Sequence, residues 1–220
     1  MDWSQLWPLL WSNTLETLYM TLIASAVSYV IGLPLGVLLV VTRADGIVPN
    51  RQLNAVLGTI INFMRSIPFI IMVAVLFPVT RFVMGKAIGT TAIIFPLIVS
   101  AFPYVARMVE SSLTEVDHGV VEAAQSMGST NWQIICKVLL PEAVPSLVNG
   151  AAISITTILG YTAMASVAGG GGLGALAIVK GLNVRKYNVM YSASCVLVLL
   201  VQLITVLGTR FTRELDHKKR

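Results

Sequence analysis

The chain has 220 residues, of which 56% are apolar and 11% are charged, and its formal net charge is +5. Soluble domains carry about a quarter charged residues, so this composition excludes an ordinary soluble domain and indicates an integral membrane protein. The basic excess lies mainly in the tail from Arg210 to Arg220, where it follows a long apolar run and indicates a cytoplasmic anchor rather than binding to nucleic acid.

Five apolar segments are long enough to cross a bilayer, which takes about 20 helical residues. Open sheets are excluded in lipid and the alternating pattern of barrel strands is absent, so the segments are predicted to be helices. The predicted spans are residues 15–41, 55–80, 88–106, 147–168 and 188–209, with a polar loop at 107–146. We therefore expect an all-α integral membrane protein in which residues 1–220 form a single transmembrane domain.

The Lys and Arg residues predict the orientation, because they gather on the cytoplasmic side of a membrane protein. Five spans put the two termini on opposite sides. If the basic tail is inside, ten of the 15 Lys and Arg residues are inside and five are outside. The N-terminus is then predicted to be outside, and the C-terminus and the polar loop to be cytoplasmic.

The second predicted span carries Arg65 three residues before Pro68. A cation inside a span is costly and often marks a functional site. From the sequence we prefer a simpler interpretation, in which residues 55–64 lie along the inner interface and Arg65 extends to the lipid headgroups. Pro68 would then kink the helix above it.

The polar loop is predicted to begin with a short helix at residues 119–127. Asp117 has the side chain and the position of an N-cap, and Gly128 those of the C′ residue. A short helix between two stop signals has the shape of a docking element. A self-packed amphipathic hairpin without a partner is the structural alternative.

Side chains of this helix are suited to contact another protein. Ala123 and Ala124 present almost no side chain, which would let the surface of a partner approach the helix backbone closely. Glu122 and Gln125 lie nearly one turn apart and can reach donors on a partner, and Met127 supplies an adaptable apolar contact.

A second helix is predicted to follow, because Thr130-Asn-Trp-Gln133 has the spacing of a capping box. We expect it to end by Leu140, since the residue before a proline, here Pro141, disfavours the α conformation.

The fourth predicted span is rich in small and hydroxyl residues, which indicates close helix packing in lipid. Met164 near its outer end is a candidate gate, although ordinary packing is the more common role of a methionine. The glycine run from Gly169 to Gly174 lacks the Lys and Ser or Thr of a phosphate loop, so we expect a turn where backbones pack closely.

Glu122, Ala123, Ala124 and Gly128 belong to a longer pattern that ends in Val138-Leu-Leu-Pro141. The pattern is Glu-Ala-Ala, three residues, Gly, nine residues, aliphatic-x-Leu-Pro. It resembles the cytoplasmic coupling loop of ABC importer permeases, with Val138 where that family usually has Ile. The runs Gly32-Leu-Pro-Leu-Gly-Val-Leu-Leu, Arg65-Ser-Ile-Pro-Phe-Ile-Ile and Lys137-Val-Leu-Leu-Pro-Glu-Ala143 resemble the methionine-uptake branch of these importers.

The resemblance implies a type I ABC importer permease in the bacterial inner membrane. It implies a homodimer that works with two copies of a cytoplasmic ATPase and an extracytoplasmic methionine-binding protein, and that moves methionine by alternating access. Residues 122–125, 127 and 128 would dock on the ATPase. The chain itself has no nucleotide-binding motif and no metal-ligand or catalytic constellation, so we expect no enzyme activity, cofactor or metal in this subunit.

Three alternatives remain from the sequence. The substrate could be another small amino acid or metabolite, because no selective polar pocket is visible. A stand-alone secondary transporter or channel would need a coupling-ion site, yet the spans lack a carboxylate near mid-membrane. A membrane scaffold without transport is the third alternative.

Overall fold

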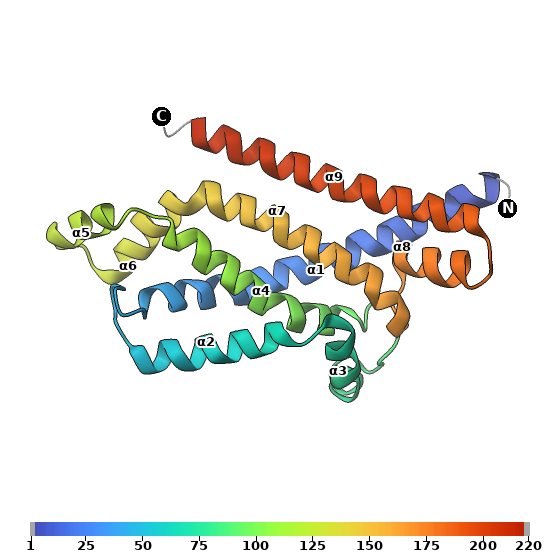
Figure 1. Cartoon of the computed structure of the whole chain (residues 1–220), viewed down its shortest axis with the longest axis horizontal. Coiled ribbons are helices and arrows are strands. Elements are labelled where there is room, and N and C mark those ends of the chain that lie inside the picture. The colour runs from blue at the N-terminus through green and yellow to red at the C-terminus, as the bar shows by residue number, and fades with distance from the viewer. Residues whose placement is uncertain (1–2, 218–220) are drawn as a thin grey trace. The chain divides into compact units, whose positions relative to one another are not determined.

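The computed structural model describes residues 3–217, and within them the chain is helical without strands (Figure 1). In order, the α-helices are α1 (Trp3–Val41), α2 (Arg51–Ser66), α3 (Phe69–Met84), α4 (Ile94–Thr114), α5 (His118–Ser126), α6 (Asn131–Ile134), α7 (Leu140–Ala165), α8 (Gly172–Ala175) and α9 (Tyr187–His217). Two π-helical segments, Ile135–Leu139 and Leu176–Leu182, and one 3-10 turn, Ser166–Ala168, join some of them.

Four helical segments are long and apolar enough to cross a membrane: Leu6–Val41, Ile94–Thr114, Val144–Ala168 and Tyr187–Leu215. Helices α2 and α3 meet the same criterion only as a pair, and the chain bends by 104° between them. The number of spans in the described part of the chain is therefore four, or five if the bent pair counts as one. The fold is that of an all-α membrane protein, as predicted.

Pro68 accounts for the break between α2 and α3. It is the N-cap of α3, with an extended conformation of φ −56° and ψ 139°. Proline has no N–H to donate and disfavours the α conformation of the residue before it, here Ile67. The segment predicted as one kinked span at residues 55–80 is thus two separate helices.

Helix α4 is shifted along the chain relative to the span predicted at residues 88–106. It begins at Ile94, after a turn in which Gly85 and Gly89 have φ of 72° and 110°. It continues to Thr114, because every third or fourth residue beyond 106 is apolar and buried. The part of the predicted loop 107–146 that lies outside the long helices is correspondingly shorter, from residue 115 to 139.

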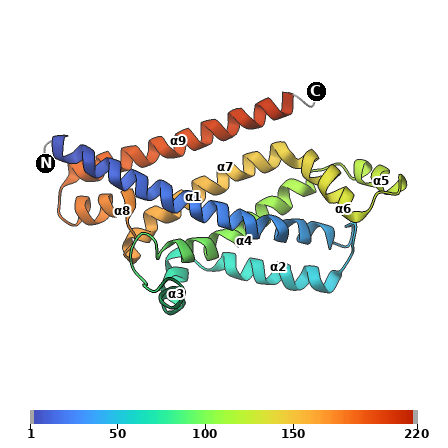
Figure 2. The ribbon, with the colours of Figure 1, turned by 180° about the vertical axis from the view of Figure 1, so that it is seen from behind.

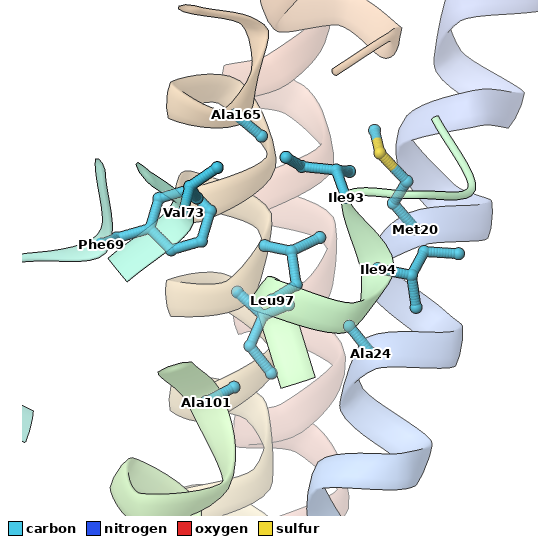
Figure 3. Close-up of a cluster of buried hydrophobic side chains, with 10 residues drawn as sticks. Met20, Ala24, Phe69, Val73, Ile93, Ile94, Leu97, Ala101 and Ala165 are labelled. Carbon is cyan, nitrogen blue, oxygen red and sulfur yellow. The ribbon is translucent and has the colours of Figure 1, made fainter. Parts of the chain in front are cut away.

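The chain divides into two compact units, each built from separate stretches of sequence. The first comprises α1 up to Ser28, Ile67–Ala101 and Ile155–Thr205. One of its cores is formed by buried side chains of α1, α3, α4 and α7, among them Met20, Val73 and Leu97 (Figure 3). The Phe69 and Tyr161 rings stack beside this core with centroids 4.9 Å apart. In both ribbon views α8 lies beside the first turns of α9, where Leu173, Leu176 and Val189 are among the residues of a second core (Figures 1 and 2).

The glycine run forms a tight turn at residues 169–171 and the first residues of α8, all within the first unit. Gly172 adopts φ of 85°, which favours glycine, and its N–H donates to Glu16 Oε2 over 2.9 Å. The Thr90 hydroxyl donates to the same carboxylate oxygen over 3.2 Å. A Cβ on Gly174 would lie within 2.6 Å of the Ala163 backbone. The prediction of a turn where backbones pack closely is confirmed.

The second unit comprises Tyr29–Ser66, Phe102–Ser154 and the part of α9 from Val206. Here α1 and α4 approach each other at two glycines of α1. A Cβ on Gly32 would lie 2.7 Å from the Val105 side chain, and one on Gly36 would lie 2.6 Å from that of Val109. The lack of side chains at these two positions therefore allows the two helices to pack closely.

Candidate docking site

Helix α5 is a short helix with a defined start and end. The Asp117 side chain accepts a hydrogen bond from the Gly119 N–H over 2.7 Å, which makes it the N-cap. Gly128 has φ of 80° with open space around it, so its backbone conformation rather than crowding favours glycine. The Gly128 N–H donates to the Gln125 carbonyl over 2.9 Å. The predicted capping by Asp117 and Gly128 is confirmed.

The two alanines of α5 face opposite environments. Ala124 is only 3% exposed and belongs to a core with Val109, Leu113 and Ile134. Ala123 is exposed. The prediction that both alanines present themselves to a partner is therefore wrong for Ala124, because its methyl group fills the core beneath the helix.

The other candidate docking residues lie on the outer side of α5 and at its end. Glu122, Gln125, Met127 and Gly128 are all exposed, and the Met127 side chain reaches 79% exposure. Together with Ala123 they form a surface that we call the docking surface. Met127 adds an exposed and flexible apolar side chain to this surface, one that can adapt to the surface of a partner.

Helix α6 begins with the predicted capping box. The Thr130 N–H donates to Gln133 Oε1 over 2.8 Å, and the Gln133 N–H donates to Thr130 Oγ1 over 3.4 Å. Trp132 within this turn is 72% exposed. Trp132 belongs to the capping pattern in the sequence, and its exposed ring is a further apolar candidate for docking.

The second helix does not end at Leu140 as predicted. A π-helical turn at Ile135–Leu139 leads directly into α7, which contains Pro141 and Pro145. A proline within an α-helix clashes with the carbonyl four residues before it, and the wider π turn relaxes that geometry at Pro141. Helix α6 is thus joined to a spanning helix without an intervening loop, and a short turn at residues 127–130 connects it to α5.

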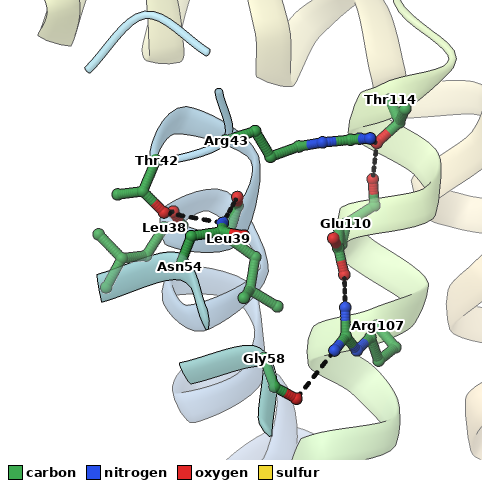
Figure 4. A network of polar contacts seen from close by, with 9 residues as sticks. All are labelled: Leu38, Leu39, Thr42, Arg43, Asn54, Gly58, Arg107, Glu110 and Thr114. Carbon is green, nitrogen blue, oxygen red and sulfur yellow. Dashed lines mark hydrogen bonds and ion pairs between the residues drawn. The ribbon is translucent and has the colours of Figure 1, made fainter. Parts of the chain in front are cut away.

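Polar contacts join α1, α2 and α4 within the second unit (Figure 4). The Arg107 guanidinium donates to the Glu110 carboxylate over 2.6 Å and to the Gly58 carbonyl over 3.0 Å. The Asn54 amide donates to the Leu39 carbonyl over 2.6 Å and to the Thr42 hydroxyl over 3.0 Å. The i, i+3 spacing of Arg107 and Glu110 is readable from sequence, whereas the contacts to α1 and α2 join residues distant in the chain.

The turn after α1 also reaches the start of α5. His118 Nε2 lies 3.8 Å from Asp45 Oδ2, and Arg43 Nη1 donates to the Thr114 hydroxyl over 3.1 Å. Val41 and Ile47 contribute to the core that holds Ala124. Displacement of α5 would therefore press on the ends of both α1 and α4. In both ribbon views α5 and α6 lie beside each other at the neighbouring ends of α4 and α7 (Figures 1 and 2).

A cleft of about 510 Å³ opens beside the start of α5. Its lining includes the carboxylates of Glu115, Asp117 and Glu142 together with Ser146 and Asn149. The three carboxylates give this side of the loop a negative charge, so basic groups on a docked partner would be favoured there.

Met164, the candidate gate, lies in the first unit and is 56% exposed. It is thus not buried in the packing of its own chain.

Among residues 3–217, no group of three His, Cys, Asp or Glu side chains is placed to hold a metal ion.

Comparison with known proteins assigns a family to most of the chain. Residues 29–220 match the family described as "Binding-protein-dependent transport system inner membrane component". A protein of Vibrio cholerae described as a probable D-methionine transport system permease protein MetI is 47% identical over 210 residues, which cover 96% of this chain and 93% of that protein. A protein of Pasteurella multocida with the same description is 47% identical over 214 residues, covering 97% and 99%.

Solved structures give the same result for the fold. The chain is similar to one in an inward-facing structure of the MetNI methionine ABC transporter, with a TM-score of 0.95, 45% identity and coverage of 98% of this chain and 99% of that chain. A chain of an amino acid ABC transporter solved with histidines has a TM-score of 0.79 at 21% identity, covering 97% and 99%. At that identity the second similarity supports the fold alone.

Proposed function

The chain belongs to the family of binding-protein-dependent transport system inner membrane components, and on this premise we propose that it is the permease subunit of an ATP-driven methionine importer. Its relatives from Vibrio cholerae and Pasteurella multocida are described as probable D-methionine transport permeases. This chain covers 93% and 99% of their lengths. ATP hydrolysis in such a system belongs to a separate ATPase subunit, and this subunit is not an enzyme. It is a multi-pass protein of the bacterial inner membrane.

The observation that carries the proposal is the docking surface on α5. Glu122, Ala123, Gln125 and Met127 are exposed around a helix whose other side is fixed by the buried Ala124. A capped helix on a packed core presents these groups in one geometry, which reduces the entropy lost when a partner binds. We assign this surface to the ATPase, with Trp132 as an additional apolar contact.

Force applied at the docking surface would reach the spanning helices directly. Helix α5 shares one core with the ends of α1 and α4, and α6 continues through the π-helical turn into α7. Packed cores transmit displacement because they deform little. ATP-driven closure of two ATPases would move two docking surfaces together and open the pathway outward, and hydrolysis would return it inward.

The proposed assembly contains two copies of this chain, two ATPases and an extracytoplasmic methionine-binding protein, surrounded by lipid. The docking surface then faces the cytoplasm, and so does the C-terminus, while the N-terminus is outside. Part of the basic tail, residues 218–220, lies outside the described residues. Met164 is proposed as a gate residue, because its exposed thioether is free to narrow a pathway formed between two copies.

Reconstitution in proteoliposomes tests the proposal. Labelled methionine should accumulate only when permease, ATPase, binding protein and ATP are all present. Uptake of a different amino acid, with none of methionine, would retain the importer and reject the substrate. Uptake by the permease alone would reject the ATP-driven mechanism in favour of a secondary transporter, and the absence of a bound ATPase would favour a scaffold.

A further inference from the structure

Arg65 lies beside the middle of the spanning helix α4, far from the ends of that helix. Its guanidinium carbon lies 5.9 Å from the centre of the Tyr104 ring. Tyr104 is the middle residue of α4, which runs from Ile94 to Thr114, and ten residues of the helix lie on each side of it. At 1.5 Å per residue, the Tyr104 Cα is therefore about 15 Å along the axis from either end of this spanning helix, and the guanidinium lies next to the ring of that residue.

The course of α2 explains this depth. Near its start, Asn54 binds the Leu39 carbonyl close to the end of α1. About two turns later, Ile61 packs in a small core with Leu39 and Ala106. The helix thus runs beside α1 and α4 from their ends toward the middle of the membrane, and Arg65 lies in its last turn. These contacts place Arg65 beside the middle of α4, deeper along that helix than the headgroup interpretation drawn from the sequence requires.

No ion pair of Arg65 with a described acidic side chain accompanies this position. Placing a cation without a counter-charge at mid-membrane is unfavourable in free energy. A cation–π contact with one tyrosine offsets only part of this desolvation penalty. The Arg65 residue is exposed, so its charge is not covered by other residues of this chain. Such residues by default indicate a substrate or ion pathway.

Polar groups of neighbouring helices lie at a similar depth. The Tyr29 hydroxyl donates to the Ser154 hydroxyl over 3.3 Å, and Ser154 is fully buried near the middle of α7. Gly32, one turn after Tyr29, meets Val105 of α4, the residue next to Tyr104. Two hydroxyl groups and one cation thus lie at a similar depth along α4 in the second unit. Broken helices near mid-membrane are where transporters commonly place substrate groups.

We propose that Arg65 binds the carboxylate of the amino acid in transit, with the Tyr104 ring holding the guanidinium in place. A guanidinium offers paired N–H donors that match the two oxygens of a carboxylate. The amino acid enters this argument from the proposed function, on which the inference rests. Arg65 then selects for a carboxylate inside the membrane, independently of the binding protein that delivers the substrate.

A charge series at position 65 tests the inference in the reconstituted complex. The variants are Arg65→Lys, Arg65→Gln, Arg65→Met and Arg65→Glu, and the matched control is Arg51→Gln at the exposed start of the same helix. Methionine uptake should fall at least tenfold in the two neutral variants and further in Arg65→Glu. Arg65→Lys should transport at least three times faster than Arg65→Gln, and the control should equal the wild type.

Two further measurements on the same variants distinguish a role of Arg65 in transport from a role in folding or assembly. Complex yield should stay near that of the wild type, and the ATP hydrolysed per methionine transported should rise about tenfold in Arg65→Gln. Uptake by Arg65→Gln within twofold of the wild type, or equal loss in the lysine and glutamine variants, overturns the inference. So does failure of both neutral variants to assemble. If the wild-type complex transports no methionine, the proposed function fails instead.

Discussion

The adjacent alanines of α5 should respond in opposite ways to the same substitution. Ala124→Arg places a long charged side chain where the native residue is 3% exposed, in a core with Leu113 and Ile134. Overpacking costs about 1 to 3 kcal/mol, and an uncompensated buried charge costs about 3 to 5 kcal/mol. The destabilisation should therefore be at least about 3 kcal/mol, a large part of the stability of a domain.

Ala123→Arg adds the same side chain at an exposed position of the same helix. Arginine is a good helix former, so the cost in unfolding free energy should stay below about 0.5 kcal/mol. Its effect should instead be on the partner, because the side chain stands in the docking surface. We expect the purified Ala123→Arg permease to keep its melting temperature and to lose most of its co-purifying ATPase.

Thermal unfolding of the purified variants, paired with an ATPase pull-down, measures both effects. Gln52→Arg, an exposed polar position at the start of α2, serves as the control and should change neither quantity. Equal loss of melting temperature in Ala123→Arg and Ala124→Arg would refute the assignment of the two faces. Full ATPase binding by Ala123→Arg would refute the docking surface.

Two further substitutions test the packing beneath the docking surface. Arg107→Met leaves the Glu110 carboxylate without the cation 2.6 Å away and removes the bond to the Gly58 carbonyl, so it should lower the unfolding free energy by about 2 to 4 kcal/mol in a detergent melt. Gly36→Val should cost about 1 to 3 kcal/mol, because its Cβ would meet the Val109 side chain at 2.6 Å; an unchanged melt would show that α1 and α4 do not pack this closely.

Local signals in the sequence predicted the caps of the loop correctly. Asp117, Gly128 and the capping box of Thr130 and Gln133 act within three residues of their targets, so each pattern contains its own bonding partner. The apolar runs likewise predicted long helices, because a membrane span depends on average hydropathy over some twenty residues.

Features that depend on tertiary packing were not predictable in the same way. A proline such as Pro68 is compatible with either a kink or a break, and contacts made by neighbouring helices decide between them. The π-helical turn that carries the chain past Leu140 has no sequence signature that we could use. The depth of Arg65 follows from contacts of α2 with α1 and α4, which lie far apart in the sequence.

The docking surface was only partly predictable from the sequence, because the core beneath α5 is formed by residues distant in the chain. The docking pattern located α5, but the pattern treats Ala123 and Ala124 alike, and only the position of the underlying core separates them. Trp132 carried no signal of exposure in the sequence, since a tryptophan after a capping residue is equally compatible with a buried position.

Photo-cross-linking from position 127 tests the docking surface most directly. With benzoylphenylalanine in place of the exposed Met127, irradiation of the assembled complex should yield a permease–ATPase adduct in high proportion. The same probe at Gln52 should yield little or none. An absence of ATPase adducts from position 127, or equal adducts from the two positions, would contradict the account that the ATPase drives this permease through α5.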